Sequence, residues 1–134
     1  NIVLRQQEKM IDWAKYPNFK ADEFKCSHCQ GEGIRAELLD KLQAMRTENG
    51  KPMTITSGYR CPQHPVELKK SAPGAHALGM AADIGVQGAE AYRVLALACK
   101  HGFSGIGVQQ KGTGRFIHVD VATTELPRPN VWSY

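Results

Sequence analysis

Two stretches of the chain carry apolar residues at helical spacing. The first runs over 34–48 and stops before Asn49-Gly50, and the second runs over 89–101 and stops at Gly102, a typical helix C-cap. The apolar positions are Leu38, Leu39, Leu42 and Met45 in the first stretch and Val94, Leu95, Leu97 and Ala98 in the second. Each pattern predicts an amphipathic helix that turns one face toward a core.

Shorter stretches that are rich in β-branched and apolar residues predict strands. One strand is expected over 53–56, before the turn Ser57-Gly58, and a second over 81–86. The segments 103–109 and 116–122 read as a hairpin. The Pro- and Lys-rich segment 61–74 predicts a loop with at most a short helix. The elements therefore follow one another in a mixed α and β order.

Length and composition fit one compact domain over 1–134. The chain has 134 residues, 42% of them hydrophobic, which is enough to bury about two thirds of the unfolded surface. No repeat or low-complexity tract occurs, and no apolar run approaches the roughly 18 residues of a membrane span. Trp13, Tyr16 and Phe19 predict an N-terminal segment packed on the core. Asn1 is not an initiator residue, so we expect a mature product or part of a longer chain.

The charge pattern argues against a nucleic-acid binder. The formal net charge is only +4, and the basic residues are scattered rather than gathered into a stripe interleaved with aromatic residues. Two interpretations stay open, namely weak attraction to a polyanion such as the bacterial cell wall and a solvated surface with a small surplus of lysine.

Three separated residues form the most informative chemical pattern. His76 and Asp83 lie seven positions apart around a run of small residues, and His118 lies in the second strand of the expected hairpin. Two imidazoles and a carboxylate suit zinc, and three protein ligands leave the fourth position for a water that acts in hydrolysis. Asp83 stands among apolar residues, where a carboxylate needs a cation to satisfy its charge. The pattern predicts an open site for one catalytic zinc.

The strand assignment also groups the neighbours of His118. Because side chains alternate across a strand, His118 and Asp120 point to one face, while Ile117, Val119 and Val121 point to the other. We expect one chemical face and one core face.

The four cysteines leave alternatives open. Cys26 and Cys29 have the two-residue gap of a zinc half-site or a redox pair, and Cys61 is a third thiol that folding could bring near. A disulfide, free thiols and a second zinc with His28 or His64 as fourth ligand are all compatible with this spacing. Cys99, inside the second helix, is expected to be a buried free thiol.

The motifs His76-x-x-Gly79-x-Ala81-x-Asp83, His118-Val119-Asp120 and Ser57-Gly58-Tyr59-Arg60-Cys61 carry a resemblance. In this order they resemble the zinc D-Ala-D-Ala carboxypeptidases and related murein peptidases, especially small phage and bacterial members, over about 19–122. The resemblance implies an α+β fold with a small antiparallel sheet and flanking helices, around a zinc core shared with the hedgehog signalling domain.

The resemblance also implies roles for single residues. His76, Asp83 and His118 would be the zinc ligands, Arg60 would grip a carboxylate or carbonyl of the substrate, and Ser57 and Tyr59 would line the same cleft. Many relatives carry the general base three residues before the last histidine, where this chain has Arg115. Asp120 is the best substitute, and the alternative is that it orients a ligand.

Two functions follow as expectations. The first is a zinc peptidase that cuts peptidoglycan or muropeptides, as a carboxypeptidase, an endopeptidase or a phage endolysin. The second is a non-catalytic zinc domain that binds the cell wall or a protein. We expect a monomer that acts in the periplasm or cell wall, with a phage member made in the host cytoplasm, and the residues leave the compartment itself open.

Overall fold

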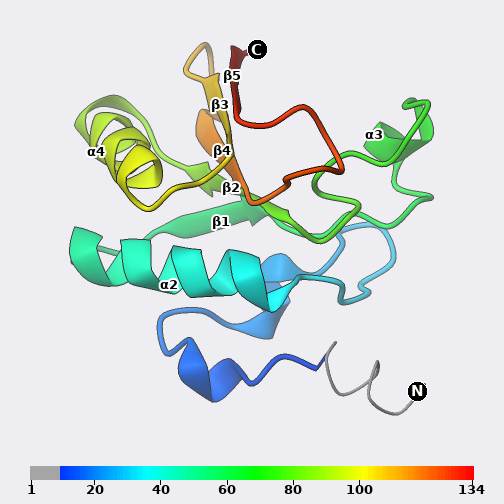
Figure 1. Cartoon of the computed structure of the whole chain (residues 1–134), viewed down its shortest axis with the longest axis horizontal. Coiled ribbons are helices and arrows are strands. Elements are labelled where there is room, and N and C mark those ends of the chain that lie inside the picture. Colours follow the sequence, from blue (N-terminus) through cyan, green and yellow to red (C-terminus); the bar gives the residue numbers. More distant parts are fainter. Residues whose placement is uncertain (1–9) are drawn as a thin grey trace.

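The computed structural model describes residues 10–134, which form helices around one sheet (Figure 1). The helical elements are η1 (Trp13–Lys15), η2 (Ala21–Phe24), α2 (Ala36–Asn49), α3 (Pro65–Leu68) and α4 (Gly88–Lys100). The strands are β1 (Thr54–Ser57), β2 (Ala81–Gly85), β3 (Gly105–Gln109), β4 (Phe116–Asp120) and β5 (Asn130–Ser133). The expected small α+β fold is confirmed.

The sheet has the strand order β1-β2-β4-β3-β5. The pairs β1·β2, β2·β4 and β3·β4 are antiparallel, as expected, but β3 and β5 are parallel. The sheet is therefore mixed rather than purely antiparallel. The sequence analysis missed β5 because prolines at 127 and 129 precede it and only four residues pair, so little strand pattern is visible.

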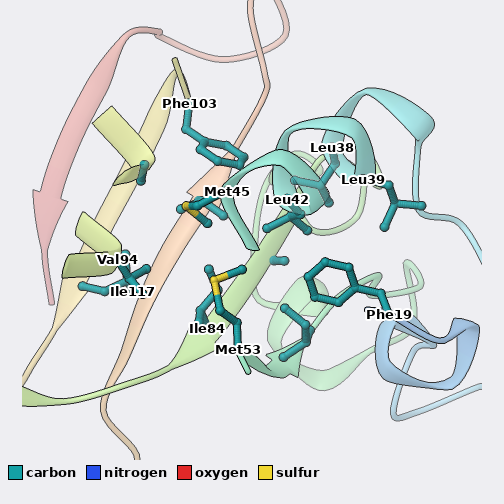
Figure 2. Packing of buried hydrophobic residues seen from close by; sticks show 14 of the residues in the cluster. Phe19, Leu38, Leu39, Leu42, Met45, Met53, Ile84, Val94, Phe103 and Ile117 are labelled. Atoms are coloured by element: carbon teal, nitrogen blue, oxygen red, sulfur yellow. The ribbon is translucent and has the colours of Figure 1, made fainter. Parts of the chain in front are cut away.

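The core lies between one face of the sheet and the helices α2 and α4. Ile84 and Ile117, which pair across β2 and β4, point to this face together with Val119. Leu38, Leu42 and Met45 of α2 pack toward them, and Val94 of α4 completes the layer (Figure 2). The expected core face of β4 is confirmed.

The helix ends follow the glycine signals. Gly50 adopts φ +69° directly after α2, and Gly102 adopts φ +74° just beyond α4, a conformation that glycine takes without a Cβ penalty. The expectation that Cys99 is buried was wrong, because its thiol is exposed. Ala98 takes the core-facing position of this turn, and the next residue rotates about 100° toward solvent.

The N-terminal aromatic residues pack on the core, as predicted. Tyr16 and Phe19 are each 4% exposed, and Trp13 and Phe19 both contact the ring of Phe24. The phenol of Tyr16 donates a hydrogen bond to Asp40 Oδ1 of α2 at 2.5 Å, which ties this segment to the helix. No described helix is long and apolar enough to cross a membrane.

Replacing Tyr16 by phenylalanine tests this tie. Burial, followed by the hydrogen bond to Asp40, raises the pKa of Tyr16 from 10.0 to about 12. The folded state thus favours the neutral phenol. The contribution of Tyr16 to folding stability is fully present below pH 10 and is lost as the pH rises through 12. We expect Tyr16→Phe to lower the free energy of unfolding by about 1 kcal/mol at pH 7. In urea titrations the deficit should shrink between pH 10 and 12, and a deficit that stays constant there would contradict this role.

Candidate functional site

The pairing of β2 with β4 creates the centre of the site. Asp83 lies directly opposite His118 in the antiparallel register, with both side chains on the face away from the core. Asp120 shares this face, as the alternation along the strand predicted. Two of the three predicted ligands therefore meet as a cross-strand pair.

His76 reaches the pair from the turn that precedes β2. Its carbonyl accepts hydrogen bonds from Arg60 N and Gly79 N, both at 3.2 Å, which closes the turn. Gly79 adopts φ +74°, and a Cβ there would overlap the carbonyl oxygen of Gly33. Glycine at this position lets the turn close against the segment before α2 and sets the direction of His76.

The three predicted ligands form a close triangle. His76 Nε2 lies 3.2 Å from Asp83 Oδ1 and 3.2 Å from His118 Nδ1, and His118 Nδ1 lies 3.1 Å from Asp83 Oδ1. A tetrahedral zinc with bonds of about 2.0–2.1 Å to nitrogen and oxygen separates its ligand atoms by about 3.3–3.4 Å. The triangle thus has nearly the size of one face of that tetrahedron.

The outward nitrogens of both histidines fix where their protons lie. His76 Nδ1 is 2.8 Å from the carbonyl of Gly58, and His118 Nε2 is 2.7 Å from Asp120 Oδ2. Both partners are acceptors, so each ring must donate its N–H outward. A neutral imidazole then turns a lone pair inward, and the triangle consists of two lone pairs and a carboxylate oxygen. A divalent cation satisfies all three atoms, so the site fits a metal.

The buried carboxylates are ionised at neutral pH. Burial raises the pKa of Asp83, but the neighbouring imidazoles of His118 and His76 outweigh it and hold that pKa well below its usual value. Asp120 shows the same competition, with His118 and Arg128 bringing its pKa down to about 2. For His118, burial lowers the pKa, but the carboxylates of Asp120 and Asp83 beside it raise it overall.

Asp120 is fully buried and held by two side chains and by Ala122 N, which donates to its Oδ1 at 3.3 Å. Besides His118, it accepts hydrogen bonds from Arg128, at 2.9 Å from Nε to Oδ1 and 2.7 Å from Nη2 to Oδ2. The Arg128 guanidinium lies 4.9 Å from the ring centre of Trp132, and the Trp132 ring lies 5.0 Å from that of His118. A carboxylate in this position favours the second of the two expected roles, orientation of the ligand His118.

Arg60 lies beside the triangle. Its Nη2 is 3.7 Å from Asp83 Oδ2, and its Nη1 is 3.7 Å from Oε2 of the buried Glu67. Glu67 also accepts from Lys70 Nζ at 2.8 Å and from Gly74 N at 3.2 Å. These contacts aim the guanidinium at the mouth of the site.

A cleft of about 400 Å³ opens over the triangle, a volume within the range of small-molecule sites. Its wall carries the basic side chains of Arg60, Lys70 and Arg128 and the rings of Trp132 and Tyr134. Ser57 and Tyr59, which were expected in this cleft, are not on its wall. Tyr59 instead packs on Gly33 and lines a separate hollow before α2.

Three residues that shape the site, Glu67, Arg128 and Trp132, were not predicted from the sequence. Glu67 stands among exposed lysines, so nothing marked it as buried. Arg128 and Trp132 lie in the segment after β4, which carried no strong strand pattern. The one available signal was Asp120 itself, because a carboxylate in an apolar strand requires a partner.

A family model described as Peptidase M15 matches residues 17–120, from the N-terminal aromatic residues to the end of β4. The matched range contains the whole triangle, Arg60 and Asp120, and it ends before Arg128 and β5. No curated protein matches the chain.

Arg128→Ala tests whether the segment after β4 supports the metal site. Without the guanidinium, Asp120 loses the charge partner that holds it against His118. We expect zinc affinity to fall about 10- to 100-fold, measured by competition with a chromophoric chelator. The control is Arg115→Ala, because Arg115 contacts the carbonyl of Gly112 in an exposed turn. Equal zinc affinities in Arg128→Ala, Arg115→Ala and the unmodified chain would contradict a role of Arg128 in zinc binding.

Proposed function

Because the chain belongs to the peptidase M15 family, we propose that it is a zinc-dependent peptidase acting on the peptide part of bacterial peptidoglycan. The observation that carries the proposal is the triangle of His76, Asp83 and His118, whose edges of 3.1–3.2 Å and inward lone pairs fit a zinc ion. Zinc, when bound, would activate a water for hydrolysis and polarise the scissile carbonyl.

The residues around the triangle suit a substrate that carries a carboxylate. Arg60 and Lys70 present cations to the cleft, and the one carboxylate on its described wall is the ligand Asp83. A planar guanidinium matches a carboxylate with two parallel hydrogen bonds. Peptidoglycan stems carry such groups at a terminal D-alanine and on acidic side chains, so Arg60 would place either kind of peptide beside the metal.

The proton that hydrolysis releases needs an acceptor, and the described cleft wall offers no uncommitted carboxylate. Asp120 is engaged by His118 and Arg128, and Glu67 by Lys70 and Gly74 N. Burial raises the pKa of Tyr134, so its phenol is protonated at neutral pH and can donate a hydrogen bond at the cleft. We assign Asp120 the role of positioning His118.

Digestion of purified sacculi tests the activity. We expect the zinc-loaded protein to release products that mass spectrometry of the muropeptides identifies. Loss of a terminal D-alanine would indicate a carboxypeptidase, and a cut within a stem or cross-link would indicate an endopeptidase such as an endolysin. Arg60→Lys keeps the charge but loses the planar fork, so kcat/KM should fall about 10- to 100-fold, which corresponds to the roughly 1.5–3 kcal/mol of a hydrogen bond to a charged group.

His76→Ala serves as the inactive control, because it removes a ligand of the triangle and should abolish zinc binding there. Release that continues at the original rate in this variant would refute the proposed metal site.

A second test separates the two roles of Asp120. If Asp120 positions His118, Asp120→Ala should bind zinc more weakly and regain most of its activity when zinc is raised to saturation. If Asp120 is the base, the variant should stay inactive at full zinc occupancy. Zinc content and kcat, measured on the same samples, distinguish these outcomes, and only the first agrees with the buried geometry.

The engaged state of Asp120 and Glu67 also favours the second candidate function, a zinc domain that binds the cell wall without cutting it. Such a domain would bind sacculi in a pull-down, lose that binding in Arg60→Ala, and release nothing at full zinc occupancy. Release of any muropeptide by the unmodified chain, and none by His76→Ala, would exclude this alternative.

A further inference from the structure

A second cluster of metal-binding side chains lies apart from the triangle. Cys26 and Cys29 flank a turn after η2, and Cys61 follows β1 by four positions. Their sulfur atoms all lie within 4.8 Å of one another. The loop before α2 lies beside the segment that leads from β1 to α3 (Figure 1). Three thiols from two distant segments therefore converge on one point.

The backbone around the cluster is arranged to stabilise sulfur as thiolate. Cys61 N donates to Cys26 Sγ at 3.2 Å, and Gly31 N donates to Cys29 Sγ at 3.3 Å. Thiolate is the form of cysteine that binds metals.

His28 is the candidate for a fourth ligand, because its Nδ1 lies 3.5 Å from Cys61 Sγ. Among the described residues, only the three sulfurs all lie within 4.8 Å of one another, so the His28 ring would have to turn toward Cys26 and Cys29 when a metal binds. In a tetrahedral zinc site with bonds of about 2.3 Å to sulfur and 2.0–2.1 Å to nitrogen, a sulfur and a nitrogen ligand are about 3.6 Å apart. His64, the other candidate, is committed elsewhere, because its Nδ1 accepts from Val66 N at 3.1 Å and its Nε2 lies 3.2 Å from Ser27 Oγ.

We propose that Cys26, Cys29, Cys61 and His28 form a second zinc site, which is structural and separate from the open triangle. Four protein ligands close the coordination shell, so this zinc has no free position for a substrate. A disulfide would join two of the sulfurs and leave the third beside it, whereas one zinc ion uses all three. The proposal does not depend on peptidase activity.

The position of Cys61 gives this zinc a role in shaping the cleft. The carbonyl of Gly58 holds His76, Tyr59 N donates to Phe24 O, and Arg60 N donates to His76 O. Cys61 is the next residue, and the second zinc would anchor it to the loop before α2. The backbone of Arg60 would thus be held before it by the hydrogen bond of Tyr59 and after it by the zinc-bound Cys61.

Metal analysis of the reduced protein tests the proposal. After exposure to excess zinc and gel filtration, we expect two zinc ions per unmodified chain by elemental mass spectrometry. Cys29→Ser and His76→Ala should each retain one. Cys29 is the choice among the three cysteines because it is exposed, so its replacement spares the core. Cys99→Ser is the matched control, an exposed thiol outside the cluster, and should retain two.

Cobalt identifies which site a variant has kept. Loaded with Co²⁺, His76→Ala should show the full sulfur-to-metal charge-transfer band of the unmodified chain, because its thiolates are intact. The band should be absent in Cys29→Ser, which has lost the second metal, and unchanged in Cys99→Ser. His28→Ala should lower the affinity for the Co²⁺ ion that gives this band, and His64→Ala should leave it unchanged. This pair of results would confirm His28 as the fourth ligand.

Two results would overturn the second site. One is a single zinc ion in the unmodified reduced chain that His76→Ala removes. The other is a disulfide within the cluster, detected when the unreduced protein is denatured with a chelator and an alkylating reagent. In that case only two of the four cysteines would be modified, whereas the proposed site requires all four.

Discussion

The register of β2 against β4 is the constraint on which the site depends. It places Asp83 opposite His118, and a shift of β2 by one residue would turn Asp83 into the core and set an apolar neighbour opposite His118. On the other side of β4, Gly107 and Gly105 face His118 and Asp120. A Cβ at Gly105 would overlap the Asp120 carboxylate, and one at Gly107 would lie 2.6 Å from the Trp132 ring. The glycines of β3 leave the space that the polar face of β4 requires.

The features that depend on local sequence patterns, namely the two long helices and the two faces of β4, were predicted from the sequence. The helices of Leu38 to Met45 and of Val94 to Ala98 follow from apolar spacing, and the alternation in β4 separated His118 from Ile117. It did not predict β5, whose pairing with β3 depends on contacts made only in the folded chain. The family resemblance placed Tyr59 in the cleft, but its ring packs on Gly33 beside a separate hollow, because neighbours in one motif can point to different sides of the chain.

Residues that act through other residues were the hardest to predict. Arg128 touches no member of the triangle, yet it holds Asp120, which in turn holds His118. Glu67 stands in a similar relation to Arg60. Such residues show no spacing of their own, since their positions follow from how loops return to the sheet. Around the triangle, Arg128 and Glu67 are surface-type charged residues in the sequence, and only the folded chain places them where they position His118 and Arg60.

The charges of the polar face distinguish the two buried carboxylates as candidate metal ligands. Asp120 and Asp83 are both buried, and a buried carboxylate requires a nearby cation. Arg128 provides one for Asp120 through two short hydrogen bonds. Asp83 has only Arg60 at 3.7 Å and two imidazoles whose protons point away from it. The protein thus neutralises Asp120 internally and leaves Asp83 short of positive charge, which a divalent cation between Asp83 and the two histidines would supply.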